Sequence, residues 1–214
     1  MEDYILSHID PEPEHLKRLY RDANLHLLYP RMMSGHLQGR FIKTLVEMIN
    51  PKRVLELGTF AGYSTLCIAE ALSDGASVDT IEIDDELQPF ITQHFNASPY
   101  SRLINLHIGD AIELVPQLKR QYGAWDVVFI DADKRLYPEY YNIALECTRP
   151  HGWIIADNTL WNGQVTNIHT TPTNSKDRQL EGVMRFNDMV AADNRVEKII
   201  LPLRDGITII RKKF

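Results

Sequence analysis

The chain has 214 residues, and its 23 basic and 29 acidic side chains give a formal net charge of −6. This length suits a single α/β domain, 1–214, and the negative charge argues against a dedicated polyanion-binding protein. There is no basic and apolar leader and no run of about 20 apolar residues, so we expect a cytoplasmic protein without a membrane span. Cys67 and Cys147 lack CxxC spacing and are expected to be reduced thiols.

Residues 1–50 are predicted to form helices that pack on a sheet core of residues 51–214. Apolar side chains recur at three- and four-residue steps over 12–29, and Tyr29-Pro30 ends that helix. A second helix is expected to follow Ser34, a suitable N-cap, and to end at Asn50-Pro51. Its inward-facing side chains are predicted to be Leu37, Phe41, Leu45, Met48 and Ile49.

From Arg53 onward, short apolar runs alternate with helical stretches, which is typical of a doubly wound, Rossmann-like sheet. The first five runs are almost continuously apolar, as expected for parallel strands covered on both faces. The short turn Arg204-Asp205-Gly206 joins the last two runs and indicates a terminal antiparallel hairpin. The seven predicted strands are 54–57, 78–83, 103–108, 125–130, 153–156, 196–201 and 206–210.

A long polar segment, 159–179, directly follows the fifth predicted strand and is rich in Thr and Asn. Structureless stretches of this length are usually functional covers or disordered segments. Its position at the carboxyl end of the sheet, where open α/β sheets bind ligands, predicts that it covers a bound ligand.

The segment 54–64 runs from a strand through a glycine turn into a helix. Gly58 and Gly62 let the backbone approach a ligand, and the helix start offers free N–H groups. Their spacing is G-x-x-x-G, so the G-x-G-x-x-G dinucleotide fingerprint is absent. Glu82 ends the second strand 24 residues after Gly58 (82 − 58), where a carboxylate can accept both hydroxyls of a ribose. These features favour a nucleoside site over a turn that serves packing alone.

Glu56 places a charge inside an otherwise apolar strand. Burying even a neutral polar group without a partner costs about 2–7 kcal/mol, so a partner is expected. The cationic group of a ligand, such as the amino group of a methionine moiety, is one candidate. A salt bridge to a Lys or Arg of the chain is the other, and this residue alone does not decide between them.

Two further predicted strands end in polar clusters. Asp131 follows the fourth strand, and Asp157 and Asn158 follow the fifth. If the two strands are neighbours, the three side chains converge at the carboxyl edge and offer hard oxygen ligands to Mg²⁺, Mn²⁺ or Ca²⁺. The alternative for each residue is helix capping or turn formation. Lys134, beside these residues, is either a base with a lowered pKa or an ion-pair partner of Asp133.

These segments resemble the cation-dependent O-methyltransferases, the group that contains catechol and caffeoyl-coenzyme A O-methyltransferases and many bacterial relatives. The resemblance spans roughly residues 32–211. It is carried by Glu56-Leu-Gly-Thr-Phe-Ala-Gly-Tyr-Ser64, Phe129-Ile-Asp-Ala-Asp-Lys134, Asp157-Asn-Thr-Leu-Trp-Asn-Gly163 and Asp205-Gly-Ile-Thr-Ile209. A departure lies at Gly35-His36-Leu37-Gln38, which replaces a segment that is usually more acidic.

The resemblance implies the methyltransferase sheet order 3-2-1-4-5-7-6, a homodimer, and methyl transfer from S-adenosylmethionine to a small hydroxylated acceptor. It implies a divalent cation held by Asp131, Asp157 and Asn158, with Asp131 and Lys134 at the reacting atoms and Lys134 in the position of a base. The S-adenosylmethionine site is expected to comprise Ser34, Glu56, Gly58, Thr59, Ser64, Glu82, Ala111 and Asp133.

Three alternatives stay open at the level of sequence. The first is an O-methyltransferase for a hydroxyuridine in tRNA, served by a basic rim, although the net charge of −6 disfavours nucleic acid. The second is a nicotinamide-dependent oxidoreductase, disfavoured by the missing fingerprint and the terminal hairpin. The third is a cofactor-binding protein without activity. The candidate rim comprises Arg31, Arg40, Lys52, Arg53 and the tail Arg211-Lys212-Lys213.

Overall fold

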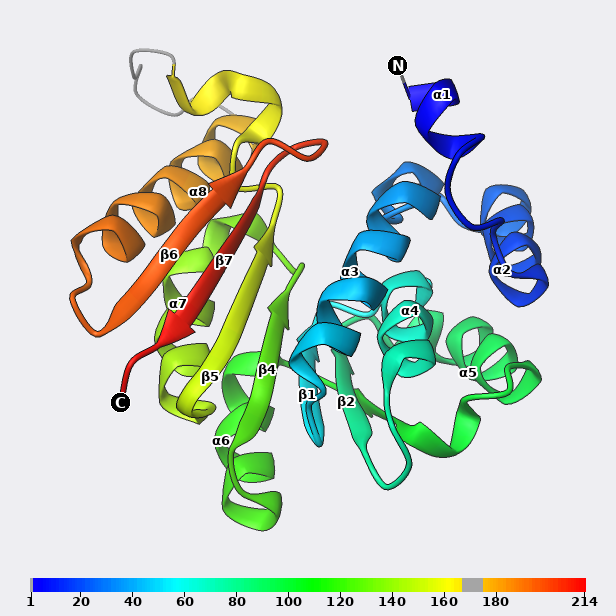
Figure 1. Cartoon of the computed structure of the whole chain (residues 1–214), viewed down its shortest axis with the longest axis horizontal. Coiled ribbons are helices and arrows are strands. Elements are labelled where there is room, and N and C mark those ends of the chain that lie inside the picture. Colours follow the sequence, from blue (N-terminus) through cyan, green and yellow to red (C-terminus); the bar gives the residue numbers. More distant parts are fainter. Residues whose placement is uncertain (1, 167–174) are drawn as a thin grey trace.

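A computed structural model describes residues 2–166 and 175–214 of the chain. Its seven strands are β1 (Arg53–Leu57), β2 (Ser77–Glu82), β3 (Ile104–Ile108), β4 (Trp125–Ile130), β5 (Thr148–Asp157), β6 (Val196–Leu201) and β7 (Ile207–Lys212). They form one sheet of order β3-β2-β1-β4-β5-β7-β6, shown in Figure 1. Strands β1 to β5 pair in parallel, and β7 runs antiparallel to both β5 and β6. The predicted strand order and the terminal hairpin are therefore confirmed.

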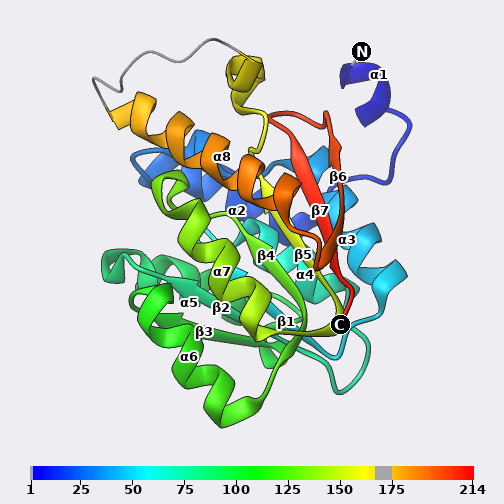
Figure 2. The same cartoon turned by 90° about the vertical axis from the view of Figure 1, so that its left-hand side faces the viewer.

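Helices lie on both faces of this sheet, as Figure 2 shows from the side. One face carries the last three long helices, and the other carries helices from the first half of the chain. The α-helices are α1 (Glu2–Leu6), α2 (Glu14–His26), α3 (His36–Ile49), α4 (Tyr63–Ala71), α5 (Gln88–Ala97), α6 (Ala111–Tyr122), α7 (Tyr137–Cys147) and α8 (Ser175–Ala192). The short 3₁₀ helices are η1 (Pro30–Met32), η2 (Asp85–Leu87), η3 (Ser101–Leu103), η4 (Lys134–Leu136) and η5 (Trp161–Thr166).

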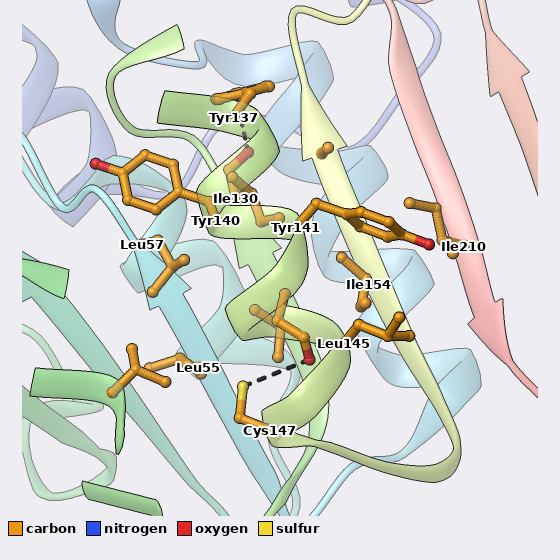
Figure 3. Packing of buried hydrophobic residues seen from close by; sticks show 14 of the residues in the cluster. Leu55, Leu57, Ile130, Tyr137, Tyr140, Tyr141, Leu145, Cys147, Ile154 and Ile210 are labelled. Carbon is orange, nitrogen blue, oxygen red and sulfur yellow. Dashed lines mark hydrogen bonds between the residues drawn. The ribbon is translucent and has the colours of Figure 1, made fainter. Parts of the chain in front are cut away.

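Alternation along the strands divides the core between the two faces. Leu55 and Leu57 of β1 point toward α6, α7 and α8, whereas Val54 points toward α3 and α4. On the first of these faces the aromatic side chains of α7 pack over the strand residues, as Figure 3 shows for Tyr137, Tyr140 and Tyr141. Burial on both faces explains why the central strands read as continuous apolar runs.

The predicted inward face of α3 is wrong. The buried positions are Gln38, Gly39, Ile42 and Val46, whereas Met48 is 79 % exposed. The cause is the close approach of α3 to α4 at Gly39, where an added methyl group would lie 2.7 Å from the Cys67 sulfur. Helix α3 therefore turns its smallest residue toward α4, and Leu37, Phe41, Leu45 and Ile49 become half-buried.

Several boundaries also differ from the prediction. Helix α2 is shorter than 12–29 at both ends, and the N-cap of α3 is Gly35, not Ser34. Strand β5 begins at Thr148, five residues before the apolar run, because Thr148 pairs with Trp125 across an irregularity in the ladder. The segment 159–179 is not structureless throughout, since it contains η5 and the start of α8. Residues 167–174 of the predicted cover lie outside the described residues. Within the described part of the chain, no helix is long and apolar enough to cross a membrane.

A buried carboxylate joins the strands at the edge opposite to their carboxyl ends. Asp79 of β2 accepts hydrogen bonds from Trp125 Nε1 at 2.8 Å and Arg53 Nη2 at 3.1 Å, and others from Asn105 Nδ2 at 3.1 Å and His107 Nε2 at 3.2 Å. Burial raises the pKa of Asp79, but these hydrogen bonds outweigh burial and lower the pKa to about 2. Asp79 therefore fastens β1, β3 and β4 to β2.

Replacing this carboxylate should weaken the fold in a pH-dependent way. Because the folded pKa of Asp79 lies below its unfolded value, its contribution to stability is present above about pH 4 and is lost as pH falls toward 2. We expect Asp79→Asn to lower the free energy of unfolding by about 1.5–3 kcal/mol at pH 7, and by less at pH 3. Urea unfolding measures this. Asp74→Asn, at an exposed turn, is the control, and an equal loss at both pH values would contradict the assignment.

Candidate functional site

The carboxyl ends of the parallel strands meet at one edge of the sheet, the upper edge in Figure 1. Strand β1 continues there into the glycine turn before α4, and β2 ends at Glu82. Strand β4 leads to Asp131, and β5 ends at Asp157. Parallel pairing therefore brings to one place the residues that the sequence marked as polar strand ends.

The glycine turn between β1 and α4 lies directly against the end of β4. Gly58 has φ of +95°, and an added methyl group there would lie 2.3 Å from the backbone oxygen of Asp131. Glu82 holds the same turn, because its Oε2 accepts a hydrogen bond from the backbone N–H of Phe60 at 2.7 Å. Phe60 itself has a φ of +48°, which is strained for a residue with a side chain. Glu82 thus shapes the turn and has lone pairs left for a ligand.

Glu56 is fully buried, and within the described residues no basic side chain pairs with it. Its Oε2 accepts hydrogen bonds from the hydroxyls of Thr65 and Thr80, the latter at 2.6 Å. Its Oε1 is buried and has no hydrogen-bond partner in the described part of the chain. Burial raises the pKa of Glu56 to about 7, against the lowering effect of hydroxyl donors that include Ser64. The predicted alternative of an internal salt bridge is therefore wrong, and one buried oxygen is left to bind a donor from a ligand.

The other predicted cofactor residues lie around the same edge. Thr59 is buried, and its hydroxyl shares a hydrogen bond of 2.6 Å with that of Thr80. Ser64 stands in the first turn of α4, and Ala111 is the first residue of α6. Asp133 caps η4 by accepting the N–H of Arg135 at 3.0 Å, and it also forms an ion pair with that side chain. Ser34 is buried on the segment that leads into α3.

The two predicted metal-binding aspartates lie at adjacent strand ends. The β4–β5 ladder pairs Ile130 with Ala156, so the next residues, Asp131 and Asp157, lie side by side. The pKa of Asp157 is raised by burial first and by the negative charge of Asp131 second. Asn158 follows with a φ of +56°. No group of three His, Cys, Asp or Glu side chains suited to a metal occurs within 2–166 and 175–214, so an oxygen site here would combine these two carboxylates with the Asn158 amide.

Lys134 pairs with Asp131, not with Asp133 as one prediction had it. Its Nζ lies 2.6 Å from Asp131 Oδ1 and 4.8 Å from the centre of the Tyr137 ring, and the residue is only 8 % exposed. Burial by itself lowers the pKa of Lys134, but the charges of Asp131 and other neighbours outweigh burial and raise the pKa above its usual value. These neighbours therefore favour the charged form of Lys134, in contrast to the lowered pKa of one alternative.

Sequence reasoning missed three residues that hold this edge together. The Tyr137 hydroxyl lies 2.9 Å from the backbone oxygen of Asp157 and 3.2 Å from that of Ile130, so it ties the ends of β4 and β5 together. Figure 3 shows Tyr137 beside Ile130. Gln38 donates to Asp157 Oδ2 at 2.6 Å and accepts from Arg204 at 2.9 Å. No local pattern marks these residues, although a buried glutamine on a helix face is a signal once the face is known.

A cavity of about 680 Å³ reaches this edge through Gln38, which lines it and donates a hydrogen bond to Asp157, whereas neither Asp131 nor Asp157 lines it. Its walls include Arg31, Ser34 and Gln38 from the segment before and within α3, together with Asn162 of η5 and Arg204 of the β6–β7 turn. Neither Glu56 nor Glu82 is among the residues that line it. The cavity is therefore separate from the glycine turn, and its volume suits a small molecule.

The chain is similar in sequence and in structure to known O-methyltransferases. The profile of the O-methyltransferase family matches residues 6–213. Caffeoyl-CoA O-methyltransferase 2 of Zea mays is 33 % identical over 205 residues, which cover 94 % of this chain and 77 % of that protein. Catechol O-methyltransferase of Niastella koreensis is 35 % identical over 167 residues, covering 78 % and 73 %. The crystal structure of an O-methyltransferase from Bacillus cereus in complex with SAH superposes with a TM-score of 0.88 at 27 % identity, covering 99 % of this chain and 96 % of that one.

The buried Glu56 should reduce the stability of the protein at neutral pH. Because its folded pKa of about 7 exceeds its ordinary value of about 4.5, its contribution to stability is most favourable below pH 4.5 and is lost as pH rises through 7. Glu56→Gln should therefore raise the temperature of the unfolding midpoint at pH 8, by about 2–4 °C for each kcal/mol gained in the free energy of unfolding. At pH 5 the midpoint should change little. Calorimetry at both pH values measures this, with exposed Glu86→Gln as the control. A variant that is less stable at pH 8 would refute the argument.

Proposed function

The chain belongs to the O-methyltransferase family, and on that premise we propose that it methylates a hydroxyl of a catechol-like or other small hydroxylated acceptor with the help of a divalent cation. The methyl donor is S-adenosylmethionine, in line with the SAH held by the Bacillus cereus neighbour. The observation that carries the proposal is the pair of aspartates at adjacent strand ends, next to a glycine turn and a cavity. The nicotinamide-dependent alternative and the alternative without activity are set aside by family membership.

The proposed cofactor site lies along β1 and β2. The free, buried Oε1 of Glu56 is suited to the ammonium group of the methionine moiety, since that group would supply the missing donor. Glu82 has lone pairs available for the ribose hydroxyls. The backbone of Gly58 and Thr59 and the first turn of α4 at Ser64 would line the path between them. Ser34, Ala111 and Asp133 complete the proposed set at its margins.

The proposed cation site is formed by Asp131, Asp157 and Asn158. The residues fit a hard cation because the two aspartates follow paired positions of adjacent strands and the negative charge of Asp131 acts on Asp157, while Lys134 pairs with Asp131. Mg²⁺ is the cation we propose, with Mn²⁺ or Ca²⁺ as alternatives of the same ligand chemistry. A cation bound there acts as a Lewis acid that stabilises the oxyanion of the acceptor.

Ionising the acceptor is the difficult part of the reaction. A phenol with a pKa near 10 lies about three units from ionisation at pH 7, a cost of roughly 4 kcal/mol. Lys134 is held as a buried cation by Asp131, so it is suited to stabilise a phenolate by its charge, as a preorganised electrostatic group. The base role that the resemblance implies is the second candidate for this residue. The cavity beside Gln38 and Arg204 would hold the remainder of the acceptor.

No arrangement of basic residues supports tRNA as the acceptor. Lys52 precedes β1 and Arg53 begins it, whereas Arg211-Lys212-Lys213 lies at the end of the antiparallel strand β7. Both groups therefore lie at the edge of the sheet opposite to the site (Figure 1). Arg40 is paired with Glu70 at 2.6 Å. Of the candidate rim in the described structure, Arg31 lines the cavity, whereas the other residues either lie at the opposite edge or are paired. The homodimer stays a prediction.

The cation proposal is tested by Asp157→Ala. We expect the variant to lose acceptor turnover and to keep S-adenosylmethionine binding, because the proposed cofactor contacts lie mainly on β1 and β2. A chelator should abolish wild-type turnover of catechol or caffeoyl esters, and Mg²⁺ should restore it in the wild type but not in the variant. Labelled-methyl transfer and calorimetry measure the two properties, and exposed Asp188→Ala is the control. A metal-free wild type that works at full rate would overturn the cation proposal and leave family membership intact.

Lys134 is tested by two substitutions of different charge. If its charge stabilises the oxyanion, Lys134→Met should lower turnover by about 10²–10³-fold, the usual loss when one such group is removed. Lys134→Arg keeps the charge and cannot act as a base at neutral pH, so it should stay within about tenfold of the wild type. Both variants should retain S-adenosylmethionine affinity. Equal inactivity of the two would assign the residue as a base instead.

A further inference from the structure

Gln38 is a buried polar side chain that joins two distant parts of the site. It lies near the start of α3, is 2 % exposed, and is separated by more than a hundred residues from each of its partners. Its Nε2 donates to Asp157 Oδ2 at 2.6 Å. Its Oε1 accepts from Arg204 Nη1 at 2.9 Å. One amide therefore links the β6–β7 turn to the end of β5.

The chemistry of the two partners fixes the orientation of this amide. A carboxamide has a donor end and an acceptor end, and a rotation of 180° exchanges them. The Arg204 guanidinium has only donors, and the Asp157 carboxylate at neutral pH has only acceptors. A rotated amide would point its NH2 group at the donors of Arg204 and its oxygen at the acceptors of Asp157. Arg204 therefore selects the orientation in which the NH2 group donates to Asp157.

The orientation of Gln38 in turn decides how Asp157 presents its oxygens. Asp157 Oδ1 accepts the backbone N–H of Asn158 at 2.7 Å, and Oδ2 accepts from Gln38. With one hydrogen bond on each oxygen, rotation of the carboxylate is restricted, and each oxygen retains a lone pair. Without Gln38, Oδ2 would lose this donor, and the negative charge of Asp131 would act on a carboxylate that is freer to rotate.

We propose that Gln38 is a positioning residue that holds Asp157 ready for a divalent cation, and that Arg204 sets the amide of Gln38 for this purpose. The inference rests on the proposed cation site and extends it to two residues outside the ligand set. Hydrogen-bond partners of metal ligands typically affect metal affinity by about 10–100-fold. The β6–β7 turn thereby becomes part of the site, although it contributes none of the proposed ligands.

The test measures Mn²⁺ binding to the full chain through the electron paramagnetic resonance signal of the free ion. Gln38→Met keeps the length of the side chain and removes both hydrogen bonds, so its Mn²⁺ dissociation constant should rise by about 10–100-fold. Arg204→Met leaves the amide free to rotate and should give a smaller rise, of about 3–10-fold. The double variant should be no worse than Gln38→Met alone, because Arg204 acts only through Gln38. S-adenosylmethionine affinity should change by less than about twofold in all three, since neither residue belongs to the proposed cofactor set.

Controls separate positioning from a purely structural role. Gln117→Met and Arg120→Met, both exposed on α6, should leave Mn²⁺ affinity unchanged. Thermal unfolding in chelator and with Mn²⁺ adds a second readout, because a positioning role reduces the rise in melting temperature that Mn²⁺ causes. If Gln38→Met is less stable in chelator yet keeps the full Mn²⁺ affinity and the full rise, the inference is overturned.

Further outcomes decide the roles of Gln38 and Arg204. Losses in Gln38→Met and Arg204→Met that multiply in the double variant would overturn the coupling between them. If Gln38→Met does not fold, unchanged Mn²⁺ affinity in Arg204→Met overturns the role of Arg204, and a weakened affinity supports it. A wild type that binds no Mn²⁺ would overturn the cation proposal and this inference together, whereas a wild type that binds it and an unaffected Gln38→Met would overturn the inference alone.

Discussion

The carboxyl edge of the sheet is organised around two carboxylates that parallel strand pairing places side by side. The register of β4 and β5 leaves Asp131 and Asp157 adjacent, and partial burial makes their mutual repulsion costly. The groups around them reduce that cost. Lys134 supplies a positive charge to Asp131, and Gln38 donates a hydrogen bond to Asp157. Tyr137 holds the two strand ends together through their backbone oxygens, so the repulsion does not separate them.

Two other buried acids show how a structural carboxylate differs from one suited to a ligand. Asp79 accepts four hydrogen bonds from side chains on neighbouring strands, and its pKa falls to about 2. Glu56 lies one strand away, on β1, receives donors on only one of its oxygens, and its pKa rises to about 7. The first joins the strands at the end away from the site and stabilises the fold. The second is expected to lower stability at neutral pH, as suits a carboxylate whose set of partners a ligand would complete.

The charged residues also differ between the two edges of the sheet. The basic residues at the start of β1 and the end of β7 lie at the edge away from the glycine turn, because β7 runs antiparallel to its neighbours. The carboxyl edge carries the paired acids and the cavity, where Arg204 contributes a cation through the β6–β7 turn. The proposed acceptor site is therefore this cavity, and the basic groups at the start of β1 and the end of β7 lie away from it in the described structure.

The sequence by itself determined the sheet and the polar residues at its carboxyl edge. Continuous apolar runs and the Arg204-Asp205-Gly206 turn predicted seven strands with a terminal hairpin, and Glu82, Asp131 and Asp157 were recognisable because each ends such a run. These signals are local, since they depend on a short run of apolar residues and on where that run stops. The face of α3 was not determined in this way, because the contact of Gly39 with α4 overrides the apolar pattern. Only the tertiary structure decided that Gln38 is buried against Asp157 and Arg204, since a hydrogen bond between residues 166 positions apart leaves no pattern in either segment.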